Sequence, residues 1–180
     1  MRKLSMEELG RVDLAAFKDQ QKTPLVLILD NVRSALNVGS SFRTADAFAL
    51  EKIYLCGITA RPPHREILKT ALGATESVEW EYKENPADAV RDLQTAGFRI
   101  LAVEQTEGST SLEQFAWTDE QPIALVFGNE VQGVSEEVLD QVDGALEVPQ
   151  FGTKHSLNIS VCLGLVVWEL FRQWKYDHPK

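Results

Sequence analysis

Three short polar stretches carry the side chains that could do chemistry in this 180-residue chain. They cover residues 37–44, 127–133 and 148–160, and each lies beside an apolar run of strand or helix length. A polar group that is buried without a partner costs roughly 1–3 kcal/mol, so polar residues at such places need an explanation. Five of them stand out: Asn37, Arg43, Glu130, Ser156 and Asn158.

These five side chains supply one fixed cation, two amides, a hydroxyl and a carboxylate, but no evident nucleophile. The same stretches contain glycines that let a backbone approach a ligand closely: Gly39, Gly128, Gly133 and Gly152. Such a set suits the transfer of a group between two bound substrates, where positioning supplies most of the rate. A simpler alternative for Ser156 is that it only caps the apolar helix that follows it.

Several common kinds of site are excluded by the motifs. The chain has no G-x-G-x-x-G dinucleotide fingerprint and no G-x-S-x-G nucleophile elbow. Lys154 follows Thr153 rather than glycine, so there is no phosphate-binding P-loop. The three histidines have no carboxylate or cysteine at ligand spacing, and we therefore expect no metal site.

The composition, 44% hydrophobic and 25% charged, is that of one globular domain spanning residues 1–180. No apolar run reaches the roughly 20 residues of a membrane-spanning helix, and the N-terminus has no apolar signal region. Cys56 and Cys162 both lie in apolar sequence and indicate reduced core thiols. A cytoplasmic protein without membrane contact is expected.

The charge is distributed unevenly along the chain. A net charge of −9 and a pI near 4.9 argue against a protein that coats nucleic acid generally. The sequence nevertheless places basic residues in or beside a few loops, which predicts a local basic patch on an acidic body. A scattered, solvated surface is the alternative. The candidate residues are Arg33, Arg61, Arg65, Lys69 and Lys154.

Hydrophobic periodicity predicts an α/β fold. The spacing of Ser5 and Glu8 is that of a capping box and predicts an N-terminal helix over about residues 6–17, within an N-terminal segment 1–20. Strands are predicted at about 24–29, 52–56, 78–82, 99–103, 123–127 and 145–148. Further helices are predicted at about 39–48, 65–72, 86–97, 135–142 and 157–176.

Strands that alternate with helices indicate a mostly parallel sheet with helices on both faces. In such sheets ligands bind beyond the carboxyl ends of the strands. The candidate site therefore lies in the loops after Leu29, Val103, Phe127 and Val148.

The three polar stretches also resemble a known family. Asn37-Val38-Gly39-Ser40-Ser41-Phe42-Arg43-Thr44 is similar to the first motif of the SpoU/TrmH group of RNA ribose methyltransferases. Phe127-Gly128-Asn129-Glu130-Val131-Gln132-Gly133 resembles the second, and Val148-Pro149 through Ser156-Leu157-Asn158-Ile159-Ser160 resembles the third. Each motif alone is weak evidence for this family, but three motifs in the same order, in a resemblance that extends from Leu25 onward, are specific evidence for it. The chain has Ala35 and Gln150 where this family usually has proline and methionine.

The resemblance implies the SPOUT fold, in which the C-terminal segment forms a deep trefoil knot. It implies that S-adenosylmethionine binds in the loops of the knot region, residues 123–176. Carried over by position, the backbone around Gly128, Val148 and Leu157 would hold this cofactor, and the strand end at Val103 would lie beside its adenosine. A tight turn at Gly128 and ordinary core packing at the other positions are the simpler alternatives.

The activity that the resemblance implies is methylation of a ribose 2′-hydroxyl in RNA, for which we favour tRNA over rRNA. The family proposal makes the arginine the general base, but a guanidinium is not deprotonated in proteins. We therefore expect Arg43 to clamp a phosphate and stabilise the developing alkoxide, with Asn37 orienting it. The remaining three, Glu130, Ser156 and Asn158, would fix the ribose and the third-motif loop.

Two other classes of function stay open at this point. One is an RNA-binding module of the same fold that has lost catalysis, although all five polar residues are present. The other is a small-molecule methyltransferase, which would suit the acidic net charge. Arg43 beside a basic cluster that includes Arg33, Arg61, Arg65, Lys69 and Lys154 favours RNA.

The last predicted helix, residues 157–176, is apolar over too much of its circumference to cover only one sheet face. Val161, Leu165 and Trp168 form one stripe, and further apolar residues widen it: Leu163, Val166, Val167, Leu170 and Trp174. The resemblance implies a two-fold homodimer built partly on this helix, in which Arg43 of one subunit serves the cofactor pocket of the other. Burial within one chain is the alternative.

Overall fold

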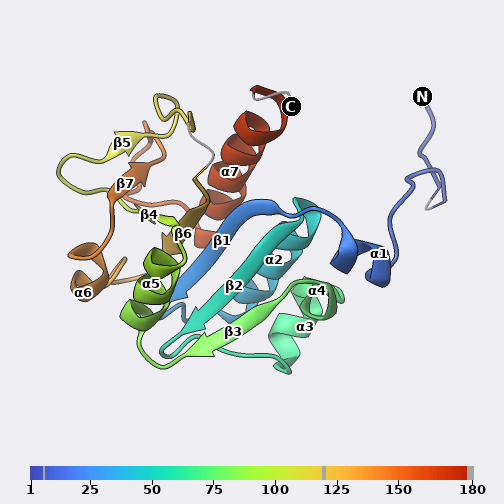
Figure 1. Cartoon of the computed structure of the whole chain (residues 1–180), viewed down its shortest axis with the longest axis horizontal. Helices are drawn as coiled ribbons and strands as arrows, with labels where there is room; N and C mark the ends of the chain where they lie inside the picture. Colours follow the sequence, from blue (N-terminus) through green and yellow to red (C-terminus); the bar gives the residue numbers. More distant parts are fainter. Residues whose placement is uncertain (6, 119–120, 178–180) are drawn as a thin grey trace.

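A computed structural model describes residues 1–5, 7–118 and 121–177 of the chain. All strand pairs within its seven-stranded sheet are parallel, and the spatial order is β3-β2-β1-β6-β4-β7-β5 (Figure 1). The predicted parallel α/β architecture is thereby confirmed. The strands are β1 (Thr23–Asp30), β2 (Leu50–Cys56), β3 (Trp80–Lys83), β4 (Arg99–Val103), β5 (Thr110–Ser111), β6 (Ile123–Phe127) and β7 (Gly144–Glu147).

The helices occupy the connections between these strands. Most were predicted within a few residues of their observed bounds. They are α1 (Leu14–Asp19), α2 (Ala35–Ala47), α3 (Arg65–Ala71), α4 (Ala74–Ser77), α5 (Pro86–Thr95), α6 (Glu136–Leu139) and α7 (Ile159–Arg172), which continues into the π-helical turn η1 (Gln173–Asp177).

The inner strand β1 is buried on both faces, because it lies between β2 and β6 and helices cover both sides of the sheet. Leu25, Leu27 and Leu29 point into one apolar cluster, and Val26 and Ile28 point into the other. This alternation follows from the two-residue period of a strand. It explains why β1 appears in the sequence as a continuous apolar run.

The two faces of the sheet are covered by different helices. One cluster contains side chains of α1, α2, α3, α4 and α7, and the other contains side chains of α5 and α6. Figure 1 shows α5 on the opposite side of the sheet from α2 and α7. Helices α2 and α7 therefore pack side by side on one face of the sheet.

The predicted N-terminal helix over residues 6–17 is wrong. Ser5 and Glu8 do form both reciprocal hydrogen bonds of a capping box, at 2.8 and 3.3 Å. Residues 7–10 make only a turn, because Gly10 adopts a φ of +57° that ends helical geometry, and the helix starts after a new cap at Asp13. The predicted first residue, Met6, lies outside the described part of the chain.

Two short elements were not predicted, and several boundaries differ by a few residues, among them the starts of two helices. Helix α4 and strand β5 are four and two residues long, too short to produce a periodic pattern. Helix α2 begins at Ala35 instead of residue 39, because Ser34 caps it by accepting from the Asn37 amide. Helix α7 begins at Ile159 instead of residue 157, because Asn158 is its cap.

Strand β7 lies between β4 and β5, although both precede it in sequence. The deep trefoil knot is not tested by this order and stays a prediction. In the described part of the chain, every helix is too short or too polar to cross a lipid bilayer.

A close helix contact at Gly39 gives a first prediction. A Cβ at this position would come within 2.1 Å of the Thr70 hydroxyl oxygen and 2.4 Å of the Ile67 carbonyl oxygen, so α2 and α3 can approach only through glycine. Gly39→Ala should lower the free energy of unfolding by about 1–3 kcal/mol, measured by urea denaturation at fixed protein concentration.

Gly152→Ala is the matched control. Its Cβ would have no neighbour within 4 Å, so the free energy of unfolding should change by less than about 0.5 kcal/mol. Equal denaturation midpoints for the Gly39 variant and the wild type would contradict the close α2–α3 contact.

Candidate functional site

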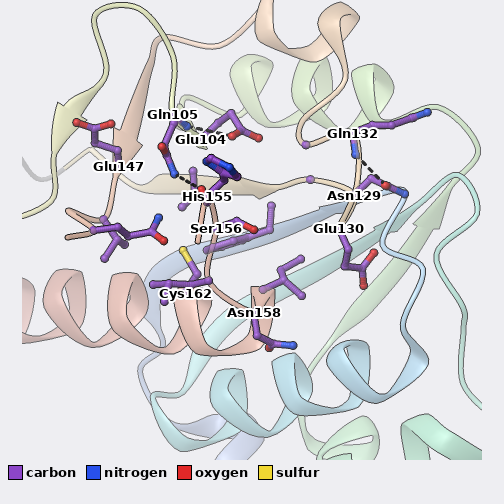
Figure 2. A pocket seen from close by; sticks show the side chains of 18 of the residues that line it. Glu104, Gln105, Asn129, Glu130, Gln132, Glu147, His155, Ser156, Asn158 and Cys162 are labelled. Atoms are coloured by element: carbon purple, nitrogen blue, oxygen red, sulfur yellow. Dashed lines mark hydrogen bonds between the residues drawn. The ribbon is translucent and has the colours of Figure 1, made fainter. Parts of the chain in front are cut away.

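A cavity of about 550 Å³ opens at the carboxyl ends of β4, β6 and β7 (Figure 2). We call it the main cavity. Its walls come from the ends of these strands, the loops that follow them and the start of α7, as expected for a parallel sheet. The wall is partly apolar, at Leu146, Val148 and Ile159, and partly polar, at Glu104 and Glu147.

The loop after β6 is closed tightly on itself. Asn129 and Gly133 exchange two backbone hydrogen bonds of 2.9 Å, and the Asn129 side-chain oxygen accepts from the amides of Val131 and Gln132. A Cβ on Gly128 would come within 2.1 Å of the Gly133 carbonyl carbon. Glycine at position 128 is therefore required by the loop itself, whatever ligand it faces.

A chain of hydrogen bonds joins the three polar stretches. The Glu130 carboxylate accepts from the amides of Arg33 (2.8 Å) and Ser34 (3.0 Å) and from the Asn37 side-chain nitrogen (3.1 Å). The Asn37 oxygen in turn accepts from the Asn158 side-chain nitrogen at 3.3 Å. We call this connection the Glu130–Asn37–Asn158 relay. It ties the loops after β1, β6 and β7 together.

The relay also sets the protonation of Glu130. Burial acts to raise the pKa of this carboxyl, but the amide donors of Arg33, Ser34, Glu130 itself and Asn37 outweigh it and lower the pKa below its usual value. Glu130 is therefore a stable anion at neutral pH. Its role here is to hold the two loops in register.

A second tether closes the main cavity from the β4 side. The Glu104 carboxylate accepts from the amides of Val134 (3.1 Å) and Gln105 (3.0 Å), and the Gln105 side chain donates to the His155 carbonyl at 3.0 Å. Figure 2 shows the Gln105 bond reaching across the cavity to the loop after β7. This loop, otherwise exposed, is thus anchored at His155 and at Asn158.

Seven of the nine residues predicted for catalysis or cofactor binding line this cavity. The four predicted cofactor contacts, Val103, Gly128, Val148 and Leu157, all line it, and so do Glu130, Ser156 and Asn158. Gln150, which replaces the family's usual methionine, also lines it, and Ala35 occupies the first position of α2. Asn37 is buried behind the cavity and reaches it through the relay.

Arg43 does not join them. It is exposed on α2 and is absent from the cavity lining. In this chain both polar atoms of the Asn37 side chain bond to Glu130 and Asn158, and the orientation of Arg43 by Asn37 stays a prediction. Arg43 follows Asn37 by six residues, which places the two side chains on different sides of the helix.

Arg43 lies instead on an outward apolar surface. In α2 it shares one exposed stripe with Leu36, seven residues earlier. In the neighbouring α7, Val161, Leu165 and Trp168 are 52%, 45% and 46% exposed, whereas the opposite side of that helix is fully buried. Both helices pack on the same sheet face, so their outward sides form one surface, which we call the α2–α7 face.

The predicted basic residues are all exposed, but they lie in three places. Arg33 is in the loop after β1, and Lys154 is in the loop that covers the main cavity. Arg65 and Lys69 belong to α3, and the Arg61 guanidinium carbon lies 4.1 Å from the centre of the Tyr82 ring. They do not form one continuous patch around the main cavity.

Some residues of the cavity were not singled out from the sequence. Gln105 and Glu147 follow or end predicted strands, and this position was the only available signal, whereas Asn129 stands in the second motif without a predicted role of its own. Cys162 also lines the cavity, and burial, with a smaller contribution from Glu104, raises the pKa of its thiol to about 11. A neutral thiol of this kind is a poor nucleophile. Within the described residues, no cluster of His, Cys, Asp or Glu could hold a metal ion.

Comparison with known proteins identifies this arrangement. The sequence model described as the SpoU rRNA Methylase family matches residues 24–168. A tRNA (guanosine(18)-2′-O)-methyltransferase of Aquifex aeolicus is 30% identical over 161 residues, which are 86% of this chain and 72% of that protein.

Two solved structures are similar in fold. An S-adenosylmethionine-bound rRNA methyltransferase from Sinorhizobium meliloti has a TM-score of 0.79 at 27% identity, over 88% of this chain and 60% of that one. A protein studied for 2-OH methylation of C/U34 on tRNA has a TM-score of 0.73 at 26% identity, over 83% of this chain and 95% of that one. This chain thus spans three fifths to nearly all of the length of these relatives.

The relay gives a second prediction. Glu130→Gln places an amide donor against the backbone amides of Arg33 or Ser34, so one hydrogen bond to a charged acceptor is lost. We expect a loss of about 1 kcal/mol in the free energy of unfolding at pH 7, because the carboxylate is partly exposed to water. Amide hydrogen exchange at Arg33 and Ser34 should become faster.

The effect depends on pH in a defined direction. A carboxyl whose pKa is lowered by folding stabilises the protein above its unfolded pKa, and this contribution is lost as the pH falls through the folded pKa. The difference between wild type and Glu130→Gln should therefore shrink below about pH 4. The control Glu107→Gln changes an exposed loop carboxylate and should have little effect at either pH. A constant difference from pH 7 to pH 3 would contradict the anchoring role.

Proposed function

The chain belongs to the SpoU rRNA Methylase family, and from this premise we propose that it transfers a methyl group from S-adenosylmethionine to a ribose 2′-hydroxyl of RNA. The observation that carries the proposal is that the second and third family motifs line one cavity at the carboxyl edge of the sheet and that the first is hydrogen-bonded to both through Asn37. The relatives named above include RNA methyltransferases, and one of them was crystallised with S-adenosylmethionine.

The main cavity suits this cofactor. Its volume of about 550 Å³ is within the range of small-molecule sites. The apolar side chains of Leu146 and Ile159 can contact an adenine ring, and the carboxylates of Glu104 and Glu147 can accept from ribose hydroxyls or face a positive charge. When bound, S-adenosylmethionine supplies an electrophilic methyl group on a sulfonium.

The residues of this chain then have to align and activate the acceptor hydroxyl. Arg43 clamps an RNA phosphate and stabilises negative charge on the 2′-oxygen as the proton leaves to a phosphate oxygen or water, because a guanidinium is a cationic donor in proteins. Ser156 and Asn158 stand at the cavity rim, where they hold the ribose. Glu130 and Asn37 act as positioning residues through the relay.

A complete site requires a second copy of the chain. Arg43 is outside its own main cavity and lies on the α2–α7 face, whose exposed leucine, valine and tryptophan side chains would be stabilised by burial. We infer a two-fold homodimer that buries this face and carries Arg43 to the main cavity of the partner. The same cofactor-binding loops would form the knot that the family resemblance implies.

We favour tRNA as the RNA. The chain spans 72% and 95% of the two relatives whose names refer to tRNA, against 60% of the rRNA methyltransferase. A cytoplasmic location accompanies this proposal and agrees with the free thiols of Cys56 and Cys162. The rival functions are a catalytically silent RNA-binding module and a small-molecule methyltransferase.

Cofactor binding gives a third prediction. S-adenosylmethionine should raise the melting temperature by an increment that grows with ligand concentration. Leu157→Trp should abolish this increment, because Leu157 lines the cavity and is exposed enough to accept a larger side chain without disturbing the core. A substitution at Gly128 is a poorer test, since its Cβ would collide with the backbone of Gly133 and distort the loop.

The control for this experiment is Phe151→Trp, in the same loop but outside the cavity lining and almost fully exposed. It should keep the wild-type increment, and the melting temperature without ligand should change little in either variant. An unchanged increment in Leu157→Trp would place the cofactor elsewhere.

The shared site gives a fourth prediction, tested by mixing two inactive variants, Arg43→Ala and Asn158→Ala. In a mixed dimer one site receives Arg43 and Asn158 from the two intact halves, and the other carries both defects. Methylation should return to at most one working site per mixed dimer, measured by mass spectrometry of nucleosides from treated tRNA. Asn158 caps α7, so the fold of its variant is checked by melting first.

Each outcome has a defined meaning. If subunits exchange and no methylation returns, the site is built within one chain and the shared-site proposal is wrong. If the wild type binds S-adenosylmethionine and methylates no RNA, the proposed RNA substrate is wrong. A wild type that binds RNA but no S-adenosylmethionine would be a silent module.

A further inference from the structure

A second cavity lies at the same edge of the sheet, beyond the carboxyl ends of β2 and β3. Its volume is about 790 Å³, within the range of small-molecule sites. The loop after β2 forms one wall, from Gly57 to Pro62 and at His64, and the edge strand β3 supplies Trp80 and Tyr82. None of these residues lines the main cavity.

The aromatic wall of this second cavity is already organised. Trp80 and Tyr82 are two residues apart on β3 and so lie on the same face of the strand. The Tyr82 hydroxyl donates to the Gly57 carbonyl at 3.1 Å, and the Arg61 guanidinium carbon lies 4.1 Å from the centre of the Tyr82 ring. Tyr82 and Arg61 thus hold each other in a stacked arrangement before any ligand binds.

Trp80 leaves a polar atom available. Its side chain is half-buried against the core, and within the described residues no hydrogen-bond acceptor is found for its indole N–H. A half-buried tryptophan presents an apolar ring together with one donor, which suits a flat heteroaromatic ligand.

The loop wall of the second cavity is basic although the protein is acidic, whereas the segment of the other wall, residues 79–84, carries Glu79, Glu81 and Glu84 beside Lys83. The segment 58–72 contains three Lys or Arg residues, at positions 61, 65 and 69, and only one carboxylate, Glu66, whereas the chain as a whole has a net charge of −9. His64 also lies at the rim. All these side chains are exposed, so the second cavity is flanked by cations that can contact phosphates.

The loops that line the two cavities are joined by hydrogen bonds through one residue. Asn31, at the end of β1, accepts from the Ile58 amide through its side chain (3.1 Å), and its carbonyl accepts from the Asn129 side chain (2.8 Å). Asn31 thereby connects the loop of the second cavity to the loop of the main cavity. Strand β2 is two strands from β6, a separation of about 10 Å at the usual strand spacing.

We propose that the second cavity binds one unpaired nucleobase of the substrate RNA, stacked against Trp80 and the guanidinium of Arg61. This inference rests on the proposed RNA substrate. Single-stranded RNA is recognised by aromatic and guanidinium planes on which splayed bases stack, and neighbouring cations hold its phosphates. The base would belong to a nucleotide near the one whose ribose enters the main cavity.

Stacking and phosphate contact predict different salt dependences. Trp80→Ala should weaken binding of unmodified bulk tRNA by about 5- to 150-fold, with an unchanged slope of log K against log salt, because no counterions are involved. Trp80→Phe should retain most of the affinity. The comparison variant Arg65→Ala/Lys69→Ala should weaken binding and reduce the magnitude of the slope by about 1–2.

Wild-type affinity in Trp80→Ala, with weaker binding in Arg65→Ala/Lys69→Ala, would overturn the base site while leaving the RNA substrate in place. If the wild type binds no tRNA, the RNA substrate and the base site both fail. The melting increment with S-adenosylmethionine should be unchanged in all these variants.

A measurement on the wild type avoids any effect of mutation on folding. Oligouridylate containing 4-thiouridine should photocrosslink to Trp80, Tyr82 or the loop from Gly57 to His64, as mapped by mass spectrometry of the peptides. Crosslinks confined to other segments would overturn the proposal.

Discussion

The architecture of the site depends on one carboxylate. Glu130 sits in a tight loop after β6, and its oxygens accept from two backbone amides of the loop after β1 and from Asn37. Asn37 then accepts from Asn158, which caps α7. Loops that are far apart in sequence are therefore held together by hydrogen bonds to a charged carboxylate. Burial alone would disfavour the charged form of Glu130, and the donors stabilise it. This connection explains why Asn37, Glu130 and Asn158 are polar although they stand beside apolar strands and helices.

The rest of the site requires close backbone approach, which glycine alone permits. Gly128 lies against Gly133, and Gly133, with a φ of +73°, leaves room for the Glu104 carboxylate. Because Glu104 also accepts from the Val134 amide, the loops after β4 and β6 share one wall of the main cavity. The close approach of these backbone segments thus shapes the main cavity. The side chain of Gln105 adds a hydrogen bond to the loop after β7.

Much of the fold and part of the site could be predicted from the sequence. Continuous apolar runs identify β1, β4 and β6, because strands buried on both faces have no polar positions. The predictions failed where the backbone conformation overrides a local sequence signal or where an element is too short to give one. The capping box at Ser5 forms but Gly10 ends the turn, and β5 is too short to show a period. The partners of Asn37 could not be predicted, because they depend on contacts between distant loops.

The position of Arg43 has a physical consequence that no single-chain fold could reveal. Arg43, which we propose meets a phosphate at the main cavity of a second copy, is exposed on α2, and the neighbouring α7 exposes apolar side chains, among them Val161 and Trp168. An exposed apolar stripe on a helix whose other side is fully buried is unfavourable in water, and covering it with a second copy removes that cost. The same association would complete the site. Pairing and catalysis would then be coupled, because the surface that we propose to be buried between two copies would also carry Arg43 to the main cavity.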